Sequence, residues 1–329
     1  MRNIPKRACF GNKGVCKRVK LQKGCVYNMI QVNSVTKKYD DFTSLDNVSF
    51  KVKDGSIFGL IGSNGSGKST LLRIMCGVFA PNVGEVLYDN EPVYENEAVK
   101  RGIVYLSDES FFKPHSTVND IKNLYKTIYP SFSEEKYNSL HKAFGLDVNT
   151  KIGKFSKGMQ KQAAVLLSLS ACPKYLLCDE TFDGLDPVMR KLVKTIIADE
   201  VAAGNITPVI ASHNLSELED FCDHIALLHK SDLVVEADLD DIKLGIHRVQ
   251  AVFDEEFTPD TLPGLEITNL EQRGRLSSFI VKGSEDVIRK VIAEKAPAYS
   301  ELLPLSLDEI FICEMEGKGY DFTSLDIGR

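Results

Sequence analysis

The octapeptide GSNGSGKS at residues 62–69 constrains this chain more than any other feature, because it fits the pattern G-x-x-x-x-G-K-[ST]. A buried apolar run at 56–61 precedes it, and a helical pattern begins at Lys68. Glycines let the backbone curl so that successive N–H groups point at phosphate oxygens, and the helix N-terminus adds a partial positive charge. The sequence therefore predicts a phosphate-binding loop between a buried strand and a helix.

We expect this loop to hold the phosphates of a nucleotide, with Mg²⁺ beside them. Lys68 would reach the β- and γ-phosphates, and the hydroxyl of Ser69 would be a ligand of Mg²⁺. The other residues of this segment are expected to bind the nucleotide mainly through main-chain N–H groups: Ser63, Asn64, Gly65, Ser66, Gly67 and Thr70.

Two acidic residues end the run YLLCDE at 175–180, where a buried hydrophobic strand emerges. Asp179 at this position can hold Mg²⁺, and Glu180 can orient or deprotonate an attacking water. A hydrophobic run that ends in two acids is a weak signal alone. Its place downstream of a phosphate-binding loop makes it a strong one.

The wider pattern alternates buried strands with helices from residue 29 onward, which predicts a largely parallel sheet covered on both faces. We therefore predict an α/β fold, namely a P-loop NTPase with a mixed, mainly parallel sheet. Two amphipathic helices within 116–146 indicate a helical subdomain at about 109–170.

Further motifs follow in a fixed order. FSKGMQ at 155–160 resembles the signature usually written LSGGQ in ATP-binding cassette (ABC) transporters. TFDGLDP matches that family's D-loop, with Asp186, and ASH matches its switch segment, with His213. Tyr39, in TKKYDDF, matches the aromatic residue that stacks on adenine. From Met29 onward the chain thus resembles the nucleotide-binding subunit of an ABC transporter, of the exporter type with a C-terminal extension.

This resemblance implies how such a chain works. The P-loop of one chain binds ATP, and the signature and D-loop of a second chain complete the site, through Ser156, Gly158 and Asp186. His213 would act with Glu180 in catalysis. Two cassettes, identical or different, would sandwich two ATP molecules, and hydrolysis would let them open. A separate transmembrane permease would use this motion, and the chain would be a cytoplasmic protein peripheral on the inner face of the cell membrane.

One position departs from the family pattern. The family usually has Gln or Glu after the strand at 102–106, where it touches Mg²⁺ and the attacking water, whereas this chain reads YLSDES. Asp108 is the nearest equivalent, so we expect it at the metal and in catalysis, with water between its short side chain and the ion; Ser107 is the less favoured choice. Lys157 replaces a common glycine of the signature, which is compatible with a side chain in solvent.

The sequence divides into three parts. Residues 1–28 hold eight Lys or Arg and no Asp or Glu, so we expect a basic, disordered arm. Either it contacts nucleic acid or anionic lipid, or it is an extension upstream of a start at Met29, which we favour. The cassette would span 29–237. After an acidic, loop-like link around 236–242, residues 247–329 would form a small α+β accessory domain that makes dimer or regulatory contacts.

Charge and composition narrow the function. The net charge of −6 gives no sign of a surface for polyanions, so no nucleic-acid partner is expected. No run approaches the ~18 apolar residues of a transmembrane helix, so any action at a membrane needs a partner. The eight cysteines lack zinc spacing and are expected to be reduced core thiols.

Three functions compete. The first is an ATPase that powers a transporter through a permease, most plausibly for export of a drug, antibiotic, peptide or lipid. The second is a soluble ABC ATPase that acts on the ribosome or on nucleic acid, although this chain has one cassette and no heptad run. The third is a degenerate cassette that binds ATP without hydrolysis. Glu180 and His213 argue against the third, because both hydrolysis positions are filled.

Overall fold

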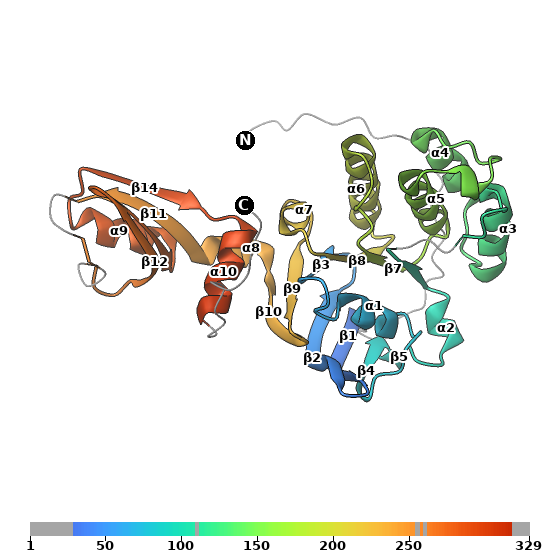
Figure 1. Cartoon of the computed structure of the whole chain (residues 1–329), viewed down its shortest axis with the longest axis horizontal. Helices are drawn as coiled ribbons and strands as arrows, with labels where there is room; N and C mark the ends of the chain where they lie inside the picture. Colours follow the sequence, from blue (N-terminus) through green and yellow to red (C-terminus); the bar gives the residue numbers. More distant parts are fainter. Residues whose placement is uncertain (1–28, 109–111, 254–256, 259–261, 318–329) are drawn as a thin grey trace.

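The computed structural model describes residues 29–108, 112–253, 257–258 and 262–317. Within them a larger α/β body carries a smaller body built from the C-terminal elements (Figure 1). The arm expected at 1–28, residues 109–111 of the expected helical subdomain, and residues 318–329 of the expected accessory domain lie outside the described residues.

The larger body is built on a six-stranded sheet of order β10-β9-β3-β8-β7-β6. Neighbouring strands are parallel except for the antiparallel pair of β9 and β10. The predicted α/β fold with a mixed, mainly parallel sheet is therefore confirmed. Its strands are β3 (Phe58–Ile61), β6 (Ile103–Leu106), β7 (Tyr175–Asp179), β8 (Thr207–Ser212), β9 (His224–His229) and β10 (Asp232–Asp238).

A second, antiparallel sheet lies beside the first, in the order β2-β1-β4-β5. Helix α1 (Lys68–Met75) packs between the two sheets (Figure 1), and its Leu71 and Leu72 are fully buried. The sequence predicts strands from residue 29 onward, but not that the first of them form an antiparallel sheet of their own. They are β1 (Met29–Tyr39), β2 (Phe42–Lys53), β4 (Val83–Tyr88) and β5 (Glu91–Pro92).

Both faces of the central sheet are covered. Along β7, Leu177 packs in the core shared with α1, whereas Leu176 and Cys178 pack in the core on the opposite face. That face is covered by α5 (Lys157–Ser170), α6 (Pro187–Ala202) and α7 (Leu215–Glu219), as Figure 1 shows. This double burial explains why the strand reads as a continuous apolar run. It also raises the pKa of the Cys178 thiol to about 12, as expected of a core cysteine.

The helical part holds α3 (Val118–Ile128), α4 (Glu134–Phe144), a 3₁₀ turn at Ile152–Lys154 and α5; the short α2 (Glu97–Lys100) precedes it. Local chemistry fixes these ends. Thr117 and Asp120 form a capping box at the start of α3, and Gly145, with a φ of 66°, ends α4.

The smaller body is a four-stranded antiparallel sheet of order β12-β13-β11-β14. Helix α9 (Glu285–Ala293) packs on one face and α10 (Leu307–Gly317) on the other. The sequence does not predict β14 or α10. The strands are β11 (Ile246–Val252), β12 (Glu266–Arg273), β13 (Leu276–Lys282) and β14 (Tyr299–Pro304).

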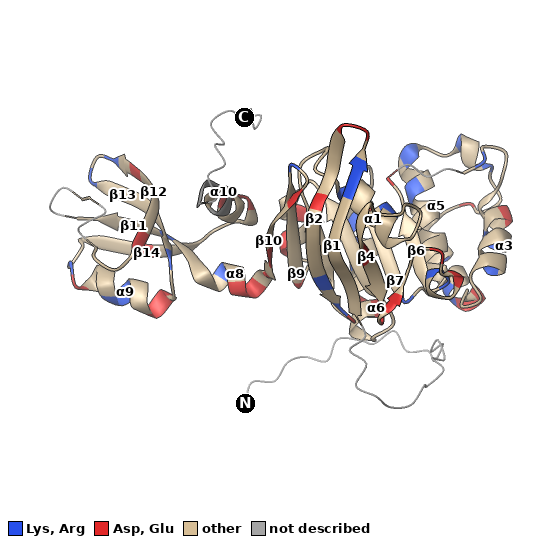
Figure 2. Cartoon of the chain, turned by 90° about the horizontal axis from the view of Figure 1, so that it is seen from below, with Lys and Arg blue, Asp and Glu red and all other residues tan. Residues whose placement is uncertain are grey.

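The prediction of a loop-like link around 236–242 is wrong. Strand β10 continues to Asp238, and α8 (Leu239–Gly245) follows directly, with its acidic residues visible in Figure 2. The carboxylate of Asp238 caps α8 by accepting a hydrogen bond from the N–H of Asp240. Leu239 is buried in the cassette core. The acidic composition of this segment is therefore that of a capped surface helix, not of a loop.

The last described helix joins the two bodies. Leu307 and Phe311 of α10 belong to the same apolar cluster as the central-sheet residues that face α5 to α7. Ile310 and Cys313 of the same helix pack instead against the sheet of the smaller body. Helix α10 thus fills part of two cores, and α7 is its neighbour in the cassette.

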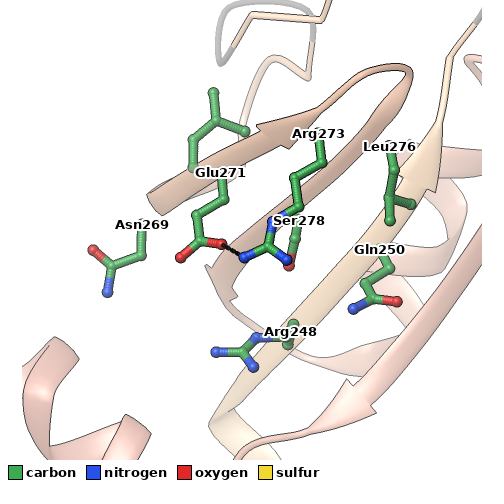
Figure 3. Close-up of a pocket in the computed structure, with 8 residues that line it drawn as sticks. Arg248, Gln250, Asn269, Glu271, Arg273, Leu276 and Ser278 are labelled. Atoms are coloured by element: carbon green, nitrogen blue, oxygen red, sulfur yellow. Dashed lines mark ion pairs between the residues drawn. The ribbon is translucent and has the colours of Figure 1, made fainter. Parts of the chain in front are cut away.

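Beyond α10, the same face of the small sheet is open and polar. Figure 3 shows Arg248, Gln250 and Ser278 among the residues that line a hollow of about 550 Å³ there. Its charges are paired within the chain: Arg273 with Glu271 at 3.7 Å, and Arg248 with Glu309 of α10 at 2.7 Å. The hollow therefore offers little unbalanced charge to a ligand.

Candidate active site

The phosphate-binding loop predicted at 62–69 connects β3 to α1. Gly65 and Gly67 have φ angles of 82° and 106°, which other residues rarely adopt. A Cβ on Gly67 would lie 2.5 Å from the carbonyl oxygen of Ser44, and one on Gly62 would lie 2.5 Å from that of Leu228. The glycines are thus required by backbone conformation and by close approach of neighbouring strands, as the motif predicts.

Lys68 is buried directly beneath this loop. Its Nζ donates hydrogen bonds to the carbonyl oxygens of Gly62 and Ser63, at 2.7 and 3.2 Å. It also lies 3.4 Å from Oε1 of Glu180, and its side chain is only 5% exposed. The ammonium therefore faces the inside of the loop, where phosphate oxygens of a nucleotide can replace these partners.

The residues expected at Mg²⁺ lie side by side. The hydroxyl of Ser69 donates to Oδ1 of Asp179 at 3.1 Å, which brings a hydroxyl and a carboxylate oxygen together at the end of β7. Mg²⁺ prefers such oxygen ligands and keeps several waters. The donor set of Ser69 and Asp179 fits this ion.

Sequence reasoning missed Tyr105 of β6. Its hydroxyl donates to the second carboxylate oxygen of Asp179, Oδ2, at 2.9 Å. Burial, and then the charge of Asp179, raises the pKa of this phenol, so it stays a donor. Because β6 pairs with β7, a polar residue near the end of β6 could have been suspected, but only with the strand order known.

Glu180 lies between a lysine and a histidine. Its Oε1 faces Lys68, and its Oε2 lies 2.9 Å from Nδ1 of His213. The backbone of Glu180 has a φ of 48°, a strained conformation for a residue other than glycine, and its N–H donates to the carbonyl of Ala211 on β8. Strand β7 and its neighbour β8 thus bring the predicted pair of Glu180 and His213 into contact.

Asp108 lies at this edge, but its partner in the structure is a lysine and not the residues of the expected metal site. Its Oδ1 is 3.1 Å from Nζ of Lys161 in α5, and that ammonium also donates to the backbone carbonyl of Glu180 at 2.7 Å. Lys161 therefore links Asp108 to Glu180 and to the helix that follows the signature. No sequence motif singles out Lys161 beyond its position in that helix.

The residues expected to act on the partner's nucleotide lie at exposed helix N-termini. Ser156 caps α5 and accepts a hydrogen bond from the N–H of Met159, while Asp186 caps α6. A Cβ on Gly158 would lie 2.9 Å from the carbonyl oxygen of Gly184, so the signature and the D-loop run against each other.

Tyr39 stands apart from the phosphate loop, at the end of β1. Its ring is 41% exposed and meets Phe79 edge to face at 6.3 Å between centroids. The Nζ of Lys37 lies 5.1 Å from the centre of the Tyr39 ring. A partly open aromatic ring on a fixed support is suited to stacking against a base.

Among the described residues, no helix is both long and apolar enough to cross a membrane.

Comparison with known proteins places these motifs in context. The family model described as "ABC transporter" matches residues 45–183. The ABC transporter ATP-binding protein YtrB of Bacillus subtilis is 31% identical over 290 residues, which cover 88% of this chain and 99% of YtrB. The bacitracin transport ATP-binding protein BcrA of Bacillus licheniformis is 27% identical over 287 residues, or 81% and 94% of the two chains.

Solved structures agree with this. An ATP-binding subunit of an ABC transporter superposes with a TM-score of 0.61 at 25% identity, over 65% of this chain and 92% of that one. The cassette MJ0796, in a dimeric post-hydrolysis state with ADP and Pi, superposes with a TM-score of 0.58 at 24% identity. The match covers 64% of this chain and 98% of that one, and it supports the fold.

Proposed function

Since the chain belongs to the family of ABC transporter ATP-binding proteins, we propose that it powers export through a separate permease by hydrolysing ATP at the edge of its central sheet. Members of this family are ATPases that bind ATP and ADP, pair as cassettes and work with transmembrane subunits. This chain, as a member, has the same properties. The expected transport ATPase is thus confirmed, and its relatives favour it over an enzyme of the ribosome or nucleic acid. The residue roles, the ion, the cargo and the location that follow are our proposal.

The phosphate loop binds the triphosphate first. Lys68 exchanges the carbonyl oxygens of Gly62 and Ser63 for β- and γ-phosphate oxygens, and the loop N–H groups from Ser63 to Thr70 surround them. Ser69 and Asp179 would hold Mg²⁺, which would neutralise charge on the phosphates, and Asp108 would serve the same ion from the neighbouring strand end. Tyr39 stacks on the adenine.

Hydrolysis then needs a base and a group that holds it. When Lys68 turns to the phosphates, Glu180 loses one partner and keeps His213 on Oε2. Its free oxygen accepts a proton from the attacking water, and the imidazole keeps the carboxylate oriented. The ammonium of Lys161, on α5, donates to the backbone carbonyl of Glu180. A rotation of α5 would therefore move the backbone of the proposed base.

The second half of each site comes from a partner cassette. Ser156 and Asp186 are exposed and Gly158 is half-buried, at positions where they can meet a nucleotide bound by another chain. Because this chain carries both halves, two copies can build two complete sites. We therefore propose a homodimer whose closure depends on the γ-phosphate.

A groove between the core and the helical part fits a permease helix. Its volume is about 380 Å³, and apart from Glu97 the residues that line it are apolar, aromatic or basic, among them Val78, Lys100, Arg101, Ile128 and Tyr129. Val78 and Ile128 are exposed, as expected of a surface that a partner covers. Tyr129 lines this groove and, like Tyr125 and Phe132, also packs against the core.

The cargo proposal rests on relatives. Among them are proteins named for transport of bacitracin and, in the Streptococcus pyogenes protein SrtF (28% identical over 230 residues), of a lantibiotic. We propose an antibiotic or a peptide-like compound as cargo, with the chain on the cytoplasmic face of the membrane.

The contact of Glu180 with both Lys68 and His213 carries the proposal, and phosphate release by the purified chain tests it. Glu180→Gln should lower kcat by about a hundredfold or more with ATP still bound. Lys68→Ala should lose ATP binding, while Lys191→Ala, a change at an exposed lysine of α6, should change neither. A Glu180→Gln protein that hydrolyses ATP at the wild-type rate would refute the assigned base.

A further inference from the structure

Three metal-binding side chains converge beside the proposed phosphate site. Glu180 and Asp183 belong to one turn, closed by a hydrogen bond from the N–H of Asp183 to the carbonyl oxygen of Glu180. His213 directly follows β8, the parallel neighbour of β7, so it emerges at the same sheet edge. One ligand atom from each residue lies within 4.8 Å of the other two.

The spacing of these atoms suits one metal ion. Nδ1 of His213 is 2.9 Å from Oε2 of Glu180 and 3.8 Å from Oδ2 of Asp183. In a tetrahedral site with bonds of about 2.0–2.2 Å, ligand atoms stand about 3.3–3.6 Å apart. Only small side-chain rotations separate the observed distances from that geometry.

The orientation and charge of the group point to the same conclusion. Lys68 holds Oε1 of Glu180, which leaves Oε2 directed at His213. Two carboxylates and a neutral imidazole balance a dication. An imidazole nitrogen suits Zn²⁺ and its neighbours in the transition series, whereas Mg²⁺ takes oxygen ligands. The set therefore differs in chemistry from the pair of Ser69 and Asp179.

We propose that Glu180, Asp183 and His213 bind a transition-metal dication such as Zn²⁺, and that the bound ion inhibits hydrolysis while leaving nucleotide binding intact. The inhibition rests on the proposed function, because the ion occupies Oε2 of Glu180 and Nδ1 of His213, the contact through which the imidazole orients the base. A dication bound to the carboxylate also makes Glu180 a weaker base. Asp183 has no part in the proposed hydrolysis. Its substitution therefore separates metal binding from catalysis.

Binding is tested first, with Co²⁺ added to the full-length chain without nucleotide. A tetrahedral site of nitrogen and oxygen ligands gives visible d–d absorption, and a cysteine site adds an ultraviolet charge-transfer band. We expect one equivalent without the thiolate band, displaced by Zn²⁺. Asp183→Asn should weaken this binding at least about tenfold. Asp241→Asn, a matched change on the exposed side of α8, should not.

Inhibition is tested second, by phosphate release with excess Mg²⁺ and increasing Zn²⁺. With each rate expressed relative to the same protein's rate without Zn²⁺, Asp183→Asn should need at least about ten times more Zn²⁺ than wild type for half-inhibition. Binding of a fluorescent ATP analogue should not respond to Zn²⁺. A thiolate band, or equal cobalt affinity of wild type and Asp183→Asn, overturns the site; equal inhibition of the two proteins overturns its regulatory effect. Neither result depends on whether Glu180→Gln is inactive.

Discussion

Polar side chains gather at two places in this molecule, at the edge of the central sheet around Glu180 and on the open face of the small sheet around Arg273. At the first, Lys68 and Asp179 are nearly inaccessible, and Glu180 is shared between Lys68 and His213. At the second, Arg273 and Glu271 pair with each other while 85% and 71% exposed.

The two places differ in their exposure to solvent and in the direction of their strands. Parallel strands β7 and β8 deliver side chains to one edge, where low accessibility strengthens their electrostatic interactions. The antiparallel small sheet spreads its polar residues over a face, where water screens them. Similar residue types therefore yield a reactive group in one region and a solvated surface in the other.

Replacing His213 by alanine should have the largest effect on turnover, because it removes a contact at the sheet edge. Without the imidazole, Oε2 of Glu180 loses its partner, and we expect kcat to fall about a hundredfold with ATP affinity retained. Steady-state phosphate release and nucleotide titration measure the two quantities, with His141→Ala on α4 as control. Unchanged turnover would mean that the convergence at the sheet edge has no chemical consequence.

Tyr105→Phe should have a smaller effect at the same edge. The change leaves Oδ2 of the buried Asp179 without its donor, and a hydrogen bond to a charged group contributes about 1.5–3 kcal/mol. We expect kcat/KM to fall about tenfold and the Mg²⁺ dependence to shift, because the hydroxyl positions a metal ligand. Tyr94→Phe, at an exposed ring, is the control; equal behaviour of both variants would remove Tyr105 from the site.

Leu307→Ala should alter stability and leave ATP affinity unchanged. This α10 side chain is completely buried in the cassette core, so its loss should cost about 2–4 kcal/mol of unfolding free energy. Urea unfolding of the whole chain measures it, against Leu244→Ala at a position that is 68% exposed. A loss as small as that of the control would show that α10 does not share the cassette core.

Arg273→Gln should change least. The pair with Glu271 is exposed, so we expect stability to stay within about 0.5 kcal/mol and turnover to be unchanged. Thermal unfolding and phosphate release check both. A large loss of turnover would give the open face of the small sheet a role that its paired charges do not suggest.

Much of this arrangement could be predicted from the sequence, for a physical reason. A phosphate loop is a local structure, so the spacing of the motif alone is enough to predict the roles of Gly67, Lys68 and Ser69. Asp179 and Glu180 could be predicted in the same way, because a buried strand must end before two acids. The expected contact of Glu180 with His213 followed from the family resemblance.

Contacts between strands and helices could not be predicted in this way. Tyr105 reaches Asp179 only because β6 lies beside β7, and Lys161 reaches Glu180 only because α5 packs over that edge. Neither neighbour is visible in a one-dimensional pattern. The link at 236–242 was misread because acidic residues are equally typical of a loop and of the exposed side of a capped helix.

The place of α10 in two cores has a consequence for synthesis. A domain usually folds as soon as its segment has left the ribosome, beginning with the N-terminal one. Here Leu307 and Phe311 complete an apolar cluster whose other members lie between Ile57 and Leu239. Part of the interior of the nascent cassette therefore stays uncovered until α10 has been translated.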